Sequence, residues 1–177
     1  MFTTYSRFCS GPEDLKDQIK IFCADYTFLV PTLRGHDGNN HKNRPMSIEQ
    51  LSNDCVTILN KKSFSRVVIA GHSMGTRLAI DIASKIKNAA GLILVDGSRF
   101  CDYEEYFEVL SNFENSLKQN NYQSLLKNMF SSMFFSESYK KDRNRIVKRA
   151  VNIPERYSLP LRRNTIWYDS HLSLIHI

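Results

Sequence analysis

Apolar positions along the first hundred residues predict strands and helices in alternation. Residues 27–30, 67–70 and 91–95 form three short runs with almost no polar interruption. Runs of this kind are typical of parallel strands that are buried on both faces. Apolar side chains also recur at helical spacing over residues 48–60 and again over residues 78–86. This order of elements predicts βαβ units and therefore an α/β fold with a parallel sheet.

The helix predicted over residues 48–60 carries a start signal in the sequence. Ser47 precedes its first apolar residue, and Gln50 follows three positions later. In such a capping box the serine oxygen accepts a hydrogen bond from the backbone N–H of the third helical residue. The sequence therefore predicts the residue at which this helix begins.

The pattern changes after Arg99. Long helical stretches rich in Phe, Tyr and Met follow, and no further strand is evident. A helical insertion after a βαβ core favours a cap over a functional site. The alternative, with equal weight, is a set of ordinary helices that pack on the sheet.

Composition and charge narrow the class of protein. A chain of 177 residues with 42% hydrophobic and 24% charged residues is typical of one soluble globular domain. Its 24 basic and 18 acidic residues give a formal charge of +6, but the densest basic run, residues 140–149, is interrupted by polar positions as a solvated helix face would be. We therefore expect neither nucleic acid nor a membrane surface as a partner. Because no signal segment or apolar run of ~20 residues is evident, we expect a cytoplasmic protein.

One segment carries a chemical motif. The apolar run 67–70 leads directly into G-H-S-M-G at residues 71–75, and a helical pattern begins at once. In a G-x-S-x-G turn between strand and helix, glycines flank the serine because the turn is too sharp for larger residues. The motif predicts Ser73 as a nucleophile at the top of the sheet and the backbone N–H of Met74 as an oxyanion donor. The alternative is a tight turn without chemistry.

Three segments together resemble the α/β-hydrolase superfamily, in the branch of small esterase-like enzymes with a helical cap. Residues 28–37 are similar to the family's strand and loop ending in P-x-L-R-G-H-G. Residues 67–83 are similar to its nucleophile elbow, and residues 91–97 to its next strand with an L-V-D ending. Their order and separations suit the family, so the resemblance covers roughly residues 8–169.

The resemblance implies an α/β-hydrolase fold, with a mostly parallel sheet, helices on both faces and a helical cap insertion. The core with the elbow is then expected over residues 1–100 and the cap over residues 101–169. Roughly the last third of the family's sheet has no counterpart in this sequence. We therefore expect the sheet to be incomplete.

Residues 8–15 are similar to the family's oxyanion loop, with one departure. Ser6-Arg7 stands where the family carries His-Gly, and Phe8 is then the candidate for the second backbone oxyanion donor. The family also places sheet strands before this loop. Only seven residues precede Phe8, so we expect these strands to be absent or degenerate.

The catalytic base has no convincing candidate in the sequence. In the α/β-hydrolase fold the triad follows the order serine, acid, histidine. Three of the five histidines do not fit this order: His36, His41 and His72. Only His171 and His176 come later, and residues 172–177 read like a translated sequencing adapter, which predicts a non-native tail. We therefore expect the base to lie beyond this chain.

An acid within the chain is the remaining possibility for the triad. Some superfamily members carry the acid after the strand that corresponds to residues 91–95, which nominates Asp96. The favoured interpretation is that Asp96 accepts hydrogen bonds from loop N–H groups, with the true acid further along the gene.

The function implied is that of a serine hydrolase acting on a small carboxylic ester or thioester through an acyl-enzyme, inactive as this chain. Alternatives on the same fold are hydrolysis of a C–C or amide bond, or acyl transfer. A further alternative is a non-catalytic binding protein, for which Ser6-Arg7 is the sequence hint. No cofactor is expected, because acyl transfer needs only the triad and the oxyanion hole. No metal is expected, because the four cysteines form no ligand cluster.

Overall fold

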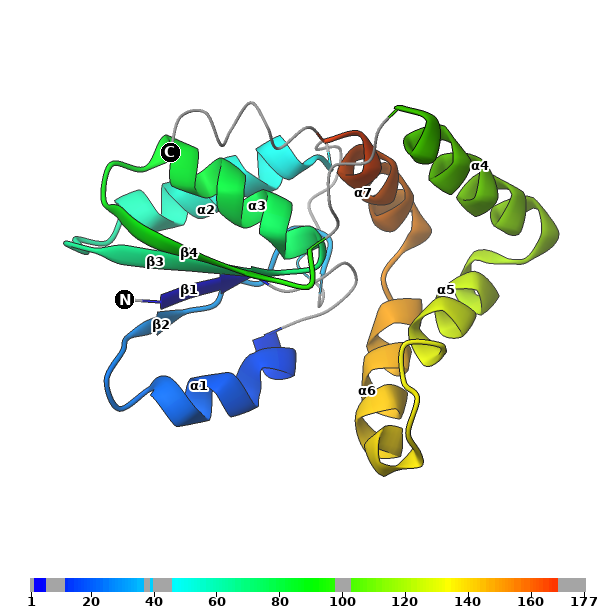
Figure 1. The fold of residues 1–177 in the computed structure, drawn as a ribbon, viewed down its shortest axis with the longest axis horizontal. Helices are drawn as coiled ribbons and strands as arrows, with labels where there is room; N and C mark the ends of the chain where they lie inside the picture. The colour runs from blue at the N-terminus through cyan, green and yellow to red at the C-terminus, as the bar shows by residue number, and fades with distance from the viewer. Residues whose placement is uncertain (1, 6–11, 37–38, 40–45, 98–102, 169–177) are drawn as a thin grey trace.

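The described residues form a four-stranded parallel sheet with helices on both faces and a further group of helices at one end (Figure 1). The computed structural model describes residues 2–5, 12–36, 39, 46–97 and 103–168. Its helices and strands, in chain order, are β1 (Phe2–Tyr5), η1 (Pro12–Leu15), α1 (Lys16–Phe22), β2 (Phe28–Leu29), α2 (Ile48–Asn60), β3 (Val67–His72), α3 (Met74–Lys85), β4 (Ala89–Val95), α4 (Tyr103–Gln119), α5 (Tyr122–Ser131), η2 (Glu137–Tyr139), α6 (Lys140–Val151) and α7 (Glu155–Trp167).

The sheet has the strand order β2-β1-β3-β4, and all three pairings are parallel. This confirms the parallel sheet predicted from the apolar runs. Before Phe8, where we expected the strands to be absent or degenerate, the structure has the single short strand β1. It pairs with β3 from Phe2↔Val68 to Tyr5↔Gly71 and with β2 on its other side. Its Phe-Thr-Thr-Tyr sequence is short, but aromatic and β-branched residues favour strands, and pairing on both sides stabilises it.

Helices α2 and α3 cover one face of the sheet, and α1 lies on the other (Figure 1). The core lies on the α2 and α3 side, where Leu51, Leu78 and Ile82 are fully buried together with Ile69 of β3. α1 contributes no fully buried residue. The two faces of the sheet are therefore covered very unequally by the described residues.

The helix predicted over roughly residues 48–60 is confirmed as α2. Its cap is also confirmed, since the Ser47 side chain accepts a hydrogen bond from the Gln50 N–H at 3.1 Å. The prediction agrees with the structure because the local capping signal and the apolar face indicate the same helix, whose Leu51 and Cys55 lie in the core.

Two of the predicted strands are less buried than expected. β2 has two residues, both half-buried, and among the described strands its one neighbour is β1. Within the part of the sheet that the structure describes, β4 has one strand neighbour, β3, and its residues Ile93, Leu94 and Val95 are exposed. A continuous apolar run therefore does not establish burial on both faces. An apolar strand with an open edge is what an incomplete sheet produces.

Helices α4 to α7 lie beyond the ends toward which the strands run, rather than on a face of the sheet (Figure 1). They bury apolar side chains among themselves and against the core, including Leu126, Phe130, Ile146, Ala150 and Leu161. Of the two interpretations left open by the sequence, this position favours the cap.

Within the described part of the chain, no helix has the length and apolar character needed to cross a membrane.

Candidate active site

Ser73 lies at the turn between β3 and α3, where its motif places it. Its φ of 54° and ψ of −120° fall in a region that L residues rarely adopt. The turn is held from both sides, because the Ser73 N–H donates to the Val95 carbonyl at 2.9 Å and the Thr76 N–H donates to the Ser73 carbonyl at 3.0 Å. The Thr76 hydroxyl donates to the same carbonyl at 2.7 Å. Backbone strain of this kind persists only where its surroundings enforce it, and it clusters at functional sites.

Two glycines permit the close approaches in this turn. A Cβ on Gly71 would lie 2.0 Å from the carbonyl oxygen of Gly75, so the backbone could not stay where it is. A Cβ on Gly97, just after β4, would lie 2.5 Å from the Thr76 hydroxyl oxygen. The strand end, the serine turn and the first turn of α3 therefore pack without room for side chains at these two positions.

Met74 is the first residue of α3, and its side chain is buried. The first N–H groups of a helix have no carbonyl partner within the helix, and they carry the positive end of its dipole. The first turn of α3 contains no acidic residue that would offset this charge. The position suits the oxyanion donor predicted at Met74, which stays a prediction. Phe8, the second predicted donor, lies outside the described residues.

Asp96 lies immediately after β4, at the same end of the sheet as Ser73. Its side chain is 88% exposed, and its Oδ2 lies 3.9 Å from Nε2 of His72. That distance exceeds a hydrogen bond, so the two groups share a charge interaction at most. The structure thus brings Asp96 beside His72, the residue before the nucleophile in sequence. An acid role for Asp96 stays a prediction.

Of the other four histidines, the structure describes one, His36. His36 is buried in the loop after β2, and its Nδ1 lies 3.0 Å from the Arg34 carbonyl oxygen. This contact fixes the ring within the loop. His41, His171 and His176 lie outside the described residues. Among the residues that are described, no group of three His, Cys, Asp or Glu side chains could hold a metal ion.

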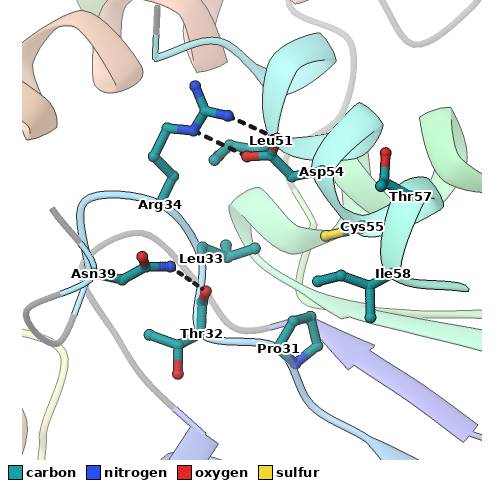
Figure 2. Close-up of a pocket in the computed structure, with 10 residues that line it drawn as sticks. All are labelled: Pro31, Thr32, Leu33, Arg34, Asn39, Leu51, Asp54, Cys55, Thr57 and Ile58. Atoms are coloured by element: carbon teal, nitrogen blue, oxygen red, sulfur yellow. Dashed lines mark hydrogen bonds and ion pairs between the residues drawn. The ribbon is translucent and has the colours of Figure 1, made fainter. Parts of the chain in front are cut away.

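A pocket of about 370 Å³ lies between the loop after β2 and helix α2 (Figure 2). At its upper end in the figure, Arg34 forms two hydrogen bonds with Asp54, from Nε to Oδ2 at 2.9 Å and from Nη2 to Oδ1 at 2.6 Å. This two-point geometry fixes the loop to α2. The residues that line the pocket belong to residues 31–39 and to α2, so it is separate from the serine turn.

Arg77, one helical turn after Ser73, connects α3 to the end of α7. The guanidinium is buried and donates to the carbonyls of Thr165, Ile166 and Tyr168, the last at 2.9 Å. The last carbonyls of a helix lack partners within it, and a cation there also opposes the negative end of the helix dipole. Arg77 therefore fixes the point at which the cap rejoins the core.

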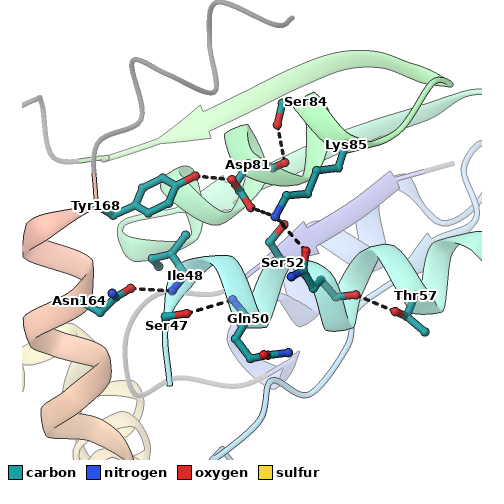
Figure 3. Close-up of polar contacts among 11 residues, drawn as sticks. Ser47, Ile48, Gln50, Ser52, Thr57, Asp81, Ser84, Lys85, Asn164 and Tyr168 are labelled. Atoms are coloured by element: carbon teal, nitrogen blue, oxygen red, sulfur yellow. Dashed lines mark hydrogen bonds and ion pairs between the residues drawn. The ribbon is translucent and has the colours of Figure 1, made fainter. Parts of the chain in front are cut away.

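Two more contacts fix the same end of α7 (Figure 3). Asn164 accepts a hydrogen bond from the Ile48 N–H at 2.8 Å, and the Tyr168 hydroxyl donates to Asp81. Asp81 also receives the Lys85 ammonium at 2.5 Å. Burial alone raises the pKa of Asp81, but the hydrogen bonds from Lys85, Ser52 and Tyr168 outweigh it and hold that pKa below its ordinary value of 3.8. The carboxylate is therefore charged at neutral pH.

The other attachment of the cap is ionic. Arg145 of α6 bonds Asp14 of η1 at 2.5 Å, and Arg149 pairs with Asp14 at 3.2 Å and with Glu13. η1 forms the last part of residues 8–15, the segment similar to the oxyanion loop. The cap is thus joined to the core within this segment as well as beside the helix of the nucleophile.

Sequence reasoning missed these attachments. Lys85 follows Asp81 at the spacing of a helical ion pair, a signal that could have been used. Arg77 stands out as a charged residue within an apolar stretch of α3, but its partners on α7 are about 90 positions away. No local pattern predicts such a contact.

The comparisons with known proteins bear on the fold. No protein-family model and no curated protein matches the chain. Among solved structures, MenH from S. aureus has a TM-score of 0.77 at 16% identity, covering 96% of this chain and 68% of its own. An esterase from Thermogutta terrifontis has a TM-score of 0.77 at 19% identity, covering 93% of this chain and 62% of its own. The bottromycin epimerase BotH has a TM-score of 0.68 at 12% identity, covering 99% of this chain and 64% of its own.

Likeness at such low identity shows the fold and leaves the reaction open, since an esterase and an epimerase both share it. The chain spans about two thirds of the length of these structures. The fold itself is the one that the sequence motifs predict.

Proposed function

We propose that this chain, which has the α/β-hydrolase fold, carries the nucleophile of a serine hydrolase that cleaves a small carboxylic ester or thioester. The observation that carries the proposal is the backbone of Ser73. A serine with φ of 54° between a parallel strand and a helix N-terminus is held in a costly conformation by Val95 and Thr76. A turn without chemistry would have no need of that strain.

In this proposal the Ser73 oxygen attacks the substrate carbonyl carbon, and the carbonyl oxygen becomes an oxyanion. The Met74 N–H donates to it, and the positive end of the α3 helix dipole adds favourable charge. The serine proton passes to a base and then to the departing alcohol or thiol, which leaves an acyl group on Ser73. Water, activated by the same base, releases the acid and restores the serine.

The base and the acid of this reaction follow Ser73 in the triad order of the fold. His171 and His176 lie outside the described residues, and the expectation that the base lies beyond this chain stays a prediction. So does the expectation that the chain alone turns over esters very slowly. Removal of a triad member leaves only the smaller contribution of the oxyanion hole and binding.

An apolar acyl or aryl group is the substrate feature that the cap suits best. The cap helices supply many aromatic and methionine side chains, among them Phe107, which is exposed. Flexible methionines and aromatic rings bind apolar groups of varied shape.

The test is hydrolysis by the protein expressed from its complete gene. Short-chain aryl esters, a thioester, an anilide and a C–C substrate are assayed with wild type, Ser73→Ala and the control Ser84→Ala. Ser84 lies near the end of α3, and its hydroxyl donates to the Asp81 carbonyl. We expect esters or thioesters to be the best substrates, with activity lost in Ser73→Ala and kept in Ser84→Ala. Faster cleavage of the anilide or the C–C substrate would show that the enzyme cleaves that bond rather than an ester. Hydrolysis unchanged in Ser73→Ala would contradict the proposal that Ser73 is the nucleophile.

A further inference from the structure

The connection between α5 and α6 exposes large apolar side chains to water. Phe135 is 98% exposed, Tyr139 is 57% exposed and Met133 is 45% exposed. Phe135 is the most exposed large apolar side chain of the described residues. We call residues 132–141 the cap tip. It lies at the lower end of the cap in Figure 1, away from the sheet.

The exposure of Phe135 is built into a defined local structure. The preceding Phe134 packs against the hydrophobic core, so the two rings of this pair go to opposite environments. The Ser136 side chain then caps η2 by accepting a hydrogen bond from the Ser138 N–H at 3.2 Å. The backbone therefore turns one phenylalanine inward and presents the next to solvent. Single exposed apolar side chains are common on protein surfaces, but several large ones within one short segment make it a candidate binding surface.

The cap tip also carries basic side chains. Lys140 and Lys141 are both exposed. The acidic residue of the tip, Glu137, is offset by two cations, with Arg143 Nη1 at 3.2 Å and Lys140 Nζ at 4.0 Å. Lys140 and Lys141 directly follow Tyr139, so the cap tip carries exposed apolar and cationic side chains within one ten-residue segment.

We propose that the cap tip docks on an anionic lipid surface. Phe135 and Met133 enter the boundary between headgroups and acyl chains, Tyr139 lies at headgroup level, and the two lysines face lipid phosphates. A stable protein interface needs about 800 Å² and roughly 20–30 residues on each side, far more than this tip presents. A fluid surface of anionic headgroups needs only a few apolar anchors and nearby positive charge. Such docking requires no membrane-crossing helix.

This proposal departs from the expectation that no membrane surface is a partner. The sequence shows Met133, Phe134 and Phe135 as one apolar run, which looks like packing core. The structure separates them by exposure, with Phe134 half-buried and the other two at the surface.

The test is co-sedimentation of the purified protein with vesicles of phosphatidylcholine alone or mixed with phosphatidylglycerol. We expect binding to the mixed vesicles that weakens at high salt. Phe135→Ser should lower the partition coefficient by about tenfold, and Lys140→Gln with Lys141→Gln should remove the preference for phosphatidylglycerol. The matched control is Phe107→Ser, which changes an exposed ring on α4, and it should bind like wild type.

Three outcomes would overturn the proposal. The first is no binding to either vesicle by a protein whose circular dichroism shows it folded. The second is an equal loss in Phe135→Ser and Phe107→Ser, which would indicate non-specific adsorption. The third is a dimer by light scattering that Phe135→Ser converts to monomer, which would assign the tip to a second copy of the chain.

Discussion

The backbone N–H of Ser73 donates to the carbonyl of Val95 at 2.9 Å, so the predicted nucleophile is tied directly to the edge strand β4. The turn depends on this bond from the strand side and on Thr76 from the helix side. Substitutions that push these elements apart should therefore act on the serine and on folding together.

Replacement of Gly71 by alanine tests the close packing of the turn. The added Cβ would meet the Gly75 backbone at 2.0 Å, and backbone atoms have little freedom to move away. We expect a loss of unfolding free energy of about 3 kcal/mol or more, measured by urea denaturation. Gly91→Ala is the control, because nothing lies within 4 Å of its added Cβ. It should change stability by less than about 1 kcal/mol. Equal effects at the two sites would contradict the geometry of the turn.

Arg77→Met tests the attachment of α7. The variant keeps much of the side-chain volume but leaves the carbonyls of Thr165 and Tyr168 without their charged donor. We expect the free energy of unfolding to fall by about 1.5–3 kcal/mol. Backbone amides in the last turn of α7 should also exchange hydrogen faster. Lys127→Met, on an exposed position of α5, should leave both unchanged. If exchange in α7 stays at the wild-type rate, Arg77 does not hold this helix.

The pH dependence of stability should report on Asp81. Its pKa is lower in the folded protein than the ordinary value of 3.8, so it stabilises the fold above that pH, and the contribution is lost as the pH falls through the folded pKa. The stability difference between wild type and Asp81→Asn should therefore be constant from neutral pH down to about pH 4 and shrink at lower pH. Denaturation at several pH values measures it, with Asp17→Asn on the exposed face of α1 as control. A difference that grows on acidification would reverse the sign and refute the assignment.

The sequence predicted those features that are encoded locally. Helix α2 was predicted at its observed position because Ser47, Gln50 and the apolar spacing all agree. β1 was missed because four residues carry no periodicity, and its stability comes from pairing with β3, more than sixty positions away. The contact of Arg77 with Tyr168 spans 91 positions and has no local signature. Phe134 and Phe135 are identical neighbours, so only the three-dimensional structure could separate the packed ring from the exposed one.

The ionic joint between the cap and η1 should be measurable as a coupling. Arg145 and Asp14 are 2.5 Å apart, with the arginine side chain about one third exposed. A double-mutant cycle of Arg145→Gln and Asp14→Asn should give a coupling energy of about 0.2–1 kcal/mol that falls as salt is added. A coupling energy of zero at low salt, or one that does not change with salt concentration, would mean that this ion pair does not join the cap to the core.

The most direct test of the central claim is covalent labelling of Ser73. The protein expressed from its complete gene is treated with a fluorophosphonate, and intact mass and peptide mapping locate the adduct. An activated serine attacks phosphorus and expels fluoride, whereas an ordinary serine hydroxyl is a poor nucleophile at neutral pH. We predict one adduct, on Ser73, that is absent from a folded Ser73→Ala variant. A folded wild-type protein that stays unlabelled at Ser73 would contradict the hydrolase assignment and leave a binding protein on a hydrolase scaffold.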